Sequence, residues 1–150
     1  MSEPDRDRRR RWMSALATAA PAALESAWAG LPERPDYEYL RRPEVGLVMV
    51  RARAGGTGTR FNLGELPVAR CSVRLTAGAV GHAYVGGRDL RHAELAAVFD
   101  ALLQDDAWRP ALTARLIEPL EAFAEARRLA AAARSAPTRV EFFTMVRGEE

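Results

Sequence analysis

Residues 46–94 read GLVMVRARAGGTGTRFNLGELPVARCSVRLTAGAVGHAYVGGRDLRHAE. Three runs within them, 46–54, 70–76 and 80–85, are rich in β-branched residues or alternate polar with apolar side chains, as strands do. The connection between the second and third runs is too short for a crossover helix, so we expect these strands to pair antiparallel. An α+β fold is therefore favoured, and a parallel α/β fold is the alternative.

Helical patterns flank this segment on both sides. Trp12 and Leu16 lie four residues apart ahead of it, next to the arginine cluster 8–11, which reads as a solvated helix start. Asp89 is placed to cap a helix whose apolar stripe includes Phe99, with Asp100 on the opposite, polar face. After Pro119 an alanine-rich helix is expected to continue to about residue 134.

These patterns predict a single domain over residues 1–150. It has N-terminal helices, a small antiparallel sheet of three to five strands packed with helices, and an extended C-terminal tail over residues 139–150. We expect residues 1–7 to be disordered and residues 30–44 to form a loop, because prolines interrupt the latter segment; a short extended piece at Tyr37 to Leu40 is compatible with that loop. The expected aromatic anchors of the core are Trp12, Trp28, Phe99 and Phe123.

Composition excludes several classes of site. All 22 basic residues are arginine, so the chain has no lysine for a Schiff base or a P-loop. The single cysteine, Cys71, excludes an intrachain disulfide and a cysteine-based zinc site, and its strand position predicts a buried thiol. Acidic residues are interspersed with the arginines and no apolar run would span a bilayer, so we expect a cytoplasmic protein that binds neither nucleic acid nor membrane.

The glycine-rich turn is the first candidate site. Its members are Gly55, Gly56, Thr57, Gly58 and the following Arg60. Successive backbone N–H groups in such a turn can bind an anion. The spacing matches neither a Walker A loop nor a dinucleotide fingerprint, so a plain connection between strands is the alternative.

Polar residues of the strands form the second candidate. We expect one polar face assembled from Arg51, Arg53, Arg70, Arg74, His82 and Tyr84. Such a face is either solvated, as the outer side of an antiparallel sheet usually is, or it binds an acidic partner or a polyphosphate.

The start of the helix after residue 89 is the third candidate. Arg88, Asp89, His92 and Glu94 lie close together in the sequence at a helix N-terminus, where anions are favoured. His92 is a candidate general acid or base, oriented by Asp89 or Glu94. A capped helix start with local ion pairs is the alternative, and no metal site is expected.

The C-terminal tail concentrates aromatic residues in a chain otherwise poor in them. Phe142, Phe143, Met145 and Arg147 are candidate interface residues. The tail either completes the domain's own sheet or reaches onto another chain by strand addition.

Several separated blocks of the sequence form a recognisable pattern. They are Arg11-Trp12-Met13-Ser14, Gly46-Leu47-Val48, Gly55-Gly56-Thr57-Gly58 with Arg60-Phe61, Val73-Arg74-Leu75-Thr76, Gly86 or Gly87 with Arg88-Asp89, His92-Ala93-Glu94, and residues 142–148. In order and spacing these blocks, which cover nearly the whole chain from Trp12 to Gly148, resemble the PhnG family, whose members are subunits of the bacterial carbon-phosphorus lyase system.

The resemblance implies a role in phosphonate catabolism. With H, I and L partners, the family is associated with transfer of the ribose triphosphate part of ATP to methylphosphonate, which releases adenine. An iron-sulfur cluster and S-adenosylmethionine belong to the J partner, and the core complex holds two copies of a PhnG chain. We therefore expect a chain that binds no cofactor of its own and is noncatalytic alone. The alternative is a direct catalytic or substrate-binding contribution from the helix start at Arg88 to Glu94.

Overall fold

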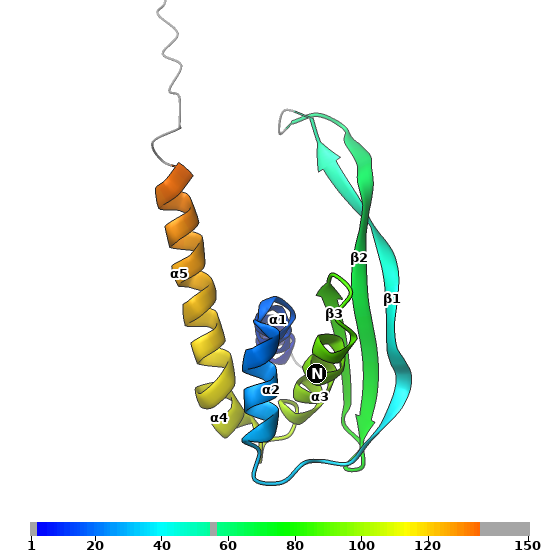
Figure 1. Cartoon of the computed structure of the whole chain (residues 1–150), viewed down its shortest axis with the longest axis vertical. Helices are drawn as coiled ribbons and strands as arrows, with labels where there is room; N and C mark the ends of the chain where they lie inside the picture. Colours follow the sequence, from blue (N-terminus) through cyan, green and yellow to red (C-terminus); the bar gives the residue numbers. More distant parts are fainter. Residues whose placement is uncertain (1–2, 55–56, 136–150) are drawn as a thin grey trace, which may run out of the picture.

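The computed structural model describes residues 3–54 and 57–135, which form nine elements around one core (Figure 1). Two helices come first, three strands follow, and helices make up the rest of the described chain, which confirms the α+β class. The elements are α1 (Glu3–Thr18), α2 (Pro21–Ala29), β1 (Tyr37–Arg53), β2 (Arg60–Leu75), β3 (Val80–Gly86), α3 (Leu90–Leu102), α4 (Arg109–Leu112), the π-helical turn η1 (Thr113–Ile117) and α5 (Glu118–Ser135).

The sheet is antiparallel in the order β1-β2-β3, as expected. A turn closed by a hydrogen bond from Leu75 N to Ala79 O, 2.9 Å long, joins β2 to β3, and Gly78 there has φ +95°. Helix α3 packs so closely on β3 that a Cβ at Gly81 would lie 1.9 Å from the Ala97 carbonyl oxygen. Glycine at this position therefore lets the helix approach the strand.

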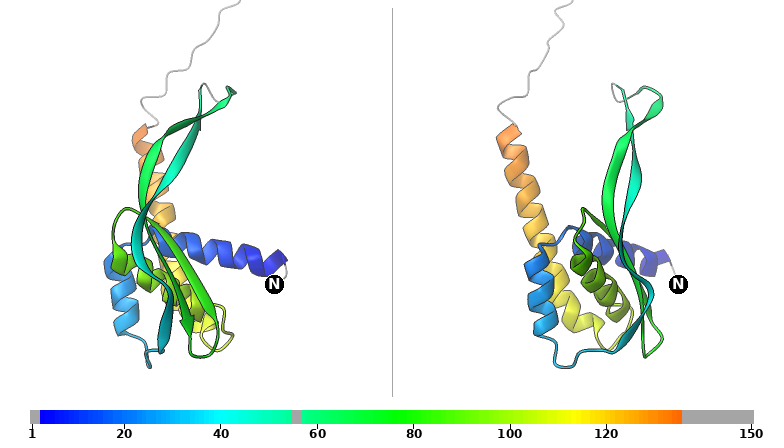
Figure 2. Two further views of the ribbon diagram at one scale, coloured as in Figure 1. Left: turned by 90° about the vertical axis from the view of Figure 1, so that its right-hand side faces the viewer. Right: turned by 45° about the vertical axis from the view of Figure 1, so that its right-hand side comes forward.

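The β1–β2 hairpin extends far beyond the third strand. β3 pairs with residues 68–74 of β2, whereas β1 accompanies β2 along its whole length. The distal part, residues 47–53 and 60–67, is a two-stranded ribbon that we call the arm. Figures 1 and 2 show that the arm and α5 extend from the core in the same general direction.

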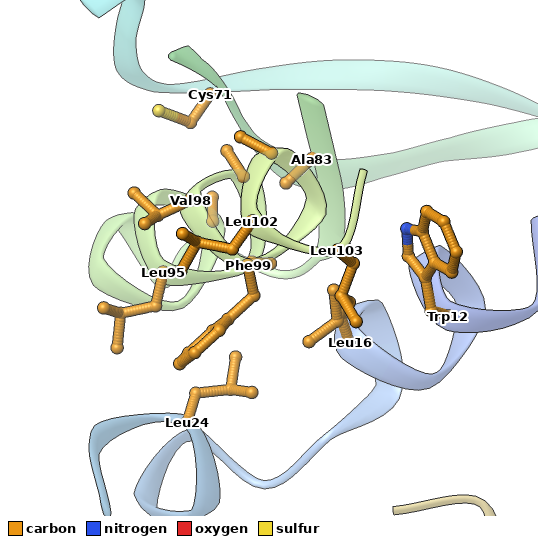
Figure 3. Close-up of a cluster of buried hydrophobic side chains, with 14 of the residues drawn as sticks. Trp12, Leu16, Leu24, Cys71, Ala83, Leu95, Val98, Phe99, Leu102 and Leu103 are labelled. Atoms are coloured by element: carbon orange, nitrogen blue, oxygen red, sulfur yellow. The ribbon is translucent and has the colours of Figure 1, made fainter. Parts of the chain in front are cut away.

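The hydrophobic core lies between α3, the sheet and the two N-terminal helices. The Phe99 side chain of α3 points toward Leu24 of α2, and Leu16 of α1 lies beside Leu103 (Figure 3). Trp12 is buried and Trp28 is half-buried, so both pack as expected. Phe123 does not: it is 58% exposed, because α5 leans away from the core.

Two other boundaries differ from expectation. α1 begins at Glu3, inside the segment expected to be disordered, where Arg8 pairs with Asp5 one turn earlier. β1 begins at Tyr37, at the start of the expected extended piece, but it runs on through Pro43, where a loop was expected. A register shift between Arg41 and Glu44 on this edge strand explains it, because a proline at a bulge need not donate a ladder hydrogen bond.

No helix among the described residues is long and apolar enough to cross a membrane. The predicted tail residues Phe142, Phe143, Met145 and Arg147 lie outside the described part of the chain.

Candidate functional site

The start of α3 is a capped helix N-terminus, as predicted. The Asp89 side chain accepts a hydrogen bond from His92 N over 2.9 Å. Just before it, Gly87 has φ +106° and donates its N–H to the Pro67 carbonyl over 2.8 Å, which fixes the turn against β2. Arg88 is exposed between these two anchored residues.

The His92 ring points into the protein, not toward solvent. The side chain is buried, and its Nε2 lies 2.8 Å from the carbonyl oxygen of Leu16, near the end of α1. Because a carbonyl only accepts, Nε2 must donate here. This bond ties α3 to α1; the acid–base role of His92 stays a prediction.

Glu94, one turn into α3, joins the helix to β1. The Tyr37 hydroxyl donates to its Oε1 over 2.8 Å, the Tyr39 hydroxyl donates to the same atom, and Arg91 Nη1 donates to Oε2 over 3.0 Å. Burial alone would raise the pKa of Glu94, but hydrogen bonds from Tyr39, Arg91 and Tyr37 outweigh it, so this pKa lies below its usual value. Burial, followed by the bond to Glu94, raises the pKa of Tyr37.

Arg91 continues this network to α2, because its Nε donates to Glu25 Oε1 over 2.9 Å. The predicted candidates at the helix start therefore reach different neighbours: the Asp89 side chain caps the helix, His92 bonds α1, and Glu94 bonds β1. Among the described contacts, no hydrogen bond joins the side chains of these residues to one another.

Asp100 contradicts the prediction that it lies on the polar face of α3. It is fully buried, not on a polar face, and accepts from Trp12 Nε1 at 2.9 Å, from His82 N at 2.9 Å, and from Arg9 at 3.1 and 2.7 Å. Arg9, expected to be solvated, is only 19% exposed. A buried carboxylate with four donors is fully satisfied, so we assign it a structural role.

The outer face of the sheet carries paired charges. Arg70 and Arg41 both bond Glu44 over 2.9 Å, and Arg74 bonds Glu38 over 3.1 Å. His82 Nδ1 lies 2.9 Å from the Ser72 hydroxyl. The arginines of this face therefore already have carboxylate partners within the sheet.

Arg51 and Arg53 do not share that face, contrary to the prediction. Glu44 lies opposite Arg70 on the outer face. The register shift between Val50 and Arg51 adds a residue to β2 and none to β1, so alternation along β1 continues from Glu44 to Arg53. Because strand side chains alternate, the odd positions Arg51 and Arg53 lie on the other face. Alternation within each strand does not show which face of β1 lies beside the arginine face of β2, because that depends on the register between the strands.

Of the predicted glycine-turn residues, Gly55 and Gly56 lie outside the described part. Thr57 and Arg60 are exposed, and Gly58 N donates to Ala54 O over 3.0 Å. This end of the arm is the turn of the hairpin.

A groove of about 1100 Å³ lies between α1 and α5. Ala15 and Thr18 line it from α1, and Leu120 and Phe123 line it from α5. An ion pair between Arg11 and Glu121 joins the two helices. No group of three or more histidine, cysteine, aspartate or glutamate residues in the described ranges is arranged to hold a metal ion.

Comparison with known proteins matches the chain to a family model and to a similar relative. A family model described as "Phosphonate metabolism protein PhnG" matches residues 7–148. A protein of Rhizobium meliloti (strain 1021), named Alpha-D-ribose 1-methylphosphonate 5-triphosphate synthase subunit PhnG, is 47% identical over 142 residues. The match covers 95% of this chain and 90% of the relative.

Proposed function

The chain belongs to the PhnG family of phosphonate metabolism proteins, and we propose that it is a subunit of an α-D-ribose 1-methylphosphonate 5-triphosphate synthase complex. In that complex the ribose triphosphate part of ATP is transferred to methylphosphonate in organic phosphonate catabolism. The chain contributes binding surface and is noncatalytic alone.

The exposed apolar side chains of the arm support a role in assembly. By strand alternation Leu47 and Met49 lie on one of its faces, and the opposed pair Val48 and Leu66 lies on the other. Leu47 is 62% exposed, Met49 50% and Leu66 56%. A ribbon of only two strands is marginally stable in water, and exposed apolar patches mark interaction sites. A partner subunit that covers both faces supplies the missing packing.

The α1–α5 groove offers a second contact. Phe123 and Leu129 are exposed on α5, which has no buried position among its described residues. An amphipathic helix of a partner subunit fits such an apolar groove.

The polar candidates support a noncatalytic role. The Asp89 side chain, His92 and Glu94 are each used in bonds that hold α3 to its own cap, to α1 and to β1. A catalytic group has to reach the reacting atoms, and these groups face their own fold.

We also propose which subunits make up the complex. We assign the H, I and L type subunits as partners in the transfer and the J type subunit as the holder of the iron-sulfur cluster and S-adenosylmethionine. Two copies of this chain belong to each cytoplasmic core complex. ATP is a substrate of the complex, and this chain holds no cofactor of its own.

The test is reconstitution with the H, I and L type subunits. Adenine release from ATP and methylphosphonate should require this chain, and the isolated chain should release none; adenine formation by the isolated chain would refute the noncatalytic role. Replacing one arm residue on each face, Leu47→Ser with Leu66→Ser, should weaken assembly at least about tenfold, because a buried leucine contributes about 1.5–3 kcal/mol.

The matched control is Leu40→Ser. Leu40 is also exposed on β1 but lies outside the arm. Assembly of the double variant with wild-type affinity would remove the arm from the interface.

A further inference from the structure

Three exposed arginines crowd the distal end of the arm without carboxylate partners. Arg51, Arg53 and Arg60 make no ion pair with any residue in the described ranges. The arginines of the outer sheet face differ, because Arg41, Arg70 and Arg74 are each paired with a glutamate. The arm therefore ends in an uncompensated positive patch.

The register places the three arginines on one face of the ribbon. Arg53 lies directly opposite Arg60, and Arg51 lies two residues from Arg53 on the same strand. Opposed residues and alternate residues share a face at Cβ separations of about 5 to 7 Å. Like charges placed opposite each other across two strands are destabilising, so a negative group among the three arginines would relieve their repulsion.

The protein itself does not supply that charge among its described residues. Glu65 is the acidic residue of the arm, opposed to Met49 nearer the core, and makes no described ion pair. An anion that neutralises the three arginines would therefore come from outside the described part of the chain.

We propose that Arg51, Arg53 and Arg60 bind the polyphosphate chain of a ribose triphosphate, either in ATP or in the product of its transfer. Guanidinium groups match phosphate oxygens in bidentate geometry, and linked phosphate groups offer each of the three arginines its own acceptors. This inference rests on the proposed function, which supplies both the substrate and the partner subunit. The patch is exposed to solvent in this chain, and the partner that covers the arm would complete the binding site. The arm then carries a binding group into a site shared between subunits.

The test in the reconstituted complex replaces all three residues, by Arg51→Gln, Arg53→Gln and Arg60→Gln. The expected result is unchanged assembly with a KM for ATP at least about tenfold higher, because charge-assisted bonds to phosphate are lost. The matched control removes three other exposed arginines that make no described ion pair, by Arg6→Gln, Arg10→Gln and Arg115→Gln, and should leave the KM unchanged.

Two outcomes in the complex would overturn the inference. An unchanged KM for ATP would show that the patch does not bind the substrate. Loss of assembly in the arm variant alone would show that the patch binds an acidic protein surface instead.

A second measurement uses the isolated full chain, so that it does not depend on assembly. Inorganic tripolyphosphate should shift the amide NMR signals of the arm at a concentration at least about tenfold below that of orthophosphate, and the triple variant should lose this difference. Equal affinity for the two anions would mean unspecific charge attraction and would refute the site. If wild-type chain fails to support turnover but shows this selectivity, the proposed function fails and the polyphosphate site stands.

Discussion

Arg9 and Asp100, 91 positions apart in the chain, form a two-bond ion pair in which the carboxylate is fully buried. Trp12 donates to the same carboxylate, and so does the backbone of His82, so α1, α3 and β3 meet at one side chain. The pair therefore fixes the N-terminal helix against the core.

Replacing Asp100 by asparagine should destabilise the protein by about 3 kcal/mol, because a partly buried guanidinium loses its counter-charge and one side of the amide cannot accept. Urea unfolding measures this. The matched control is Glu125→Gln, which removes an exposed ion pair with Arg128 and should cost less than about 1 kcal/mol. Equal effects would contradict the structural role of Asp100.

Gly81→Ala should be destabilising by about 2 kcal/mol or more, because the new methyl group would overlap the Ala97 carbonyl and force α3 away from β3. Gly86→Ala is the control on the same strand, where a Cβ meets nothing within 4 Å. Its effect should stay within about 1 kcal/mol. Thermal unfolding of the two variants gives the comparison, and similar melting temperatures would rule out the close approach.

His92→Ala should lower stability by about 1–3 kcal/mol, since the Leu16 carbonyl loses its buried donor. In the reconstituted complex, adenine release per assembled complex should stay at the wild-type level. A variant that assembles fully but has lost turnover would instead support the acid–base role predicted for this residue.

Glu94→Gln should reduce the dependence of stability on acid pH. The pKa of Glu94 is lowered in the folded state, so its stabilising contribution is complete above the unfolded-state pKa of about 4.3 and is lost as the pH falls through the folded value. Wild type should exceed the variant by about 1–2 kcal/mol at pH 7, and the gap should narrow below pH 4. Urea midpoints at both pH values test it; a constant gap would contradict the lowered pKa.

Cys71 should react slowly with thiol reagents. Burial, followed by the charge of Glu94, raises the pKa of the Cys71 thiol from its ordinary 9.0 to about 11. The thiolate fraction at pH 8 then falls by about a hundredfold, and burial adds to the protection. Labelling should become fast when urea unfolds the chain, and fast labelling of folded protein would contradict a buried thiol.

The antiparallel sheet and the Asp89 cap were predictable because each rests on neighbours in sequence. Alternation marks a strand, a short turn forces antiparallel pairing, and a cap needs residues three positions apart. The burial of Cys71 followed from the same alternation.

The arm and the Asp100 network depend on contacts between residues that are far apart in sequence, and no local sequence pattern predicts such contacts. Residues 61–67 include Gly64, Glu65 and Pro67, which disfavour a strand, yet pairing with β1 extends β2 through them. The position of Asp100 on the helix is typical of a solvent-exposed residue. Its burial is favourable only because Arg9 and Trp12 donate hydrogen bonds to the carboxylate.

Phe123 was predicted to be a core residue, and its exposure shows what helical periodicity does not predict. Its helical spacing correctly indicated an apolar stripe on α5, but periodicity cannot say whether a stripe is covered by the same chain. The structure leaves it exposed beside α1.

The outer edge of β1 has a wider consequence for the cell that makes this protein. The strand is 17 residues long, and alternate residues along its outer side present backbone N–H and C=O groups that pair with no other described strand, next to exposed leucine and methionine side chains. Such an edge is a template for aggregation until another chain covers it. A copy produced in excess of its partners would be prone to precipitation or proteolysis, so the amount that persists would follow the supply of the other subunits.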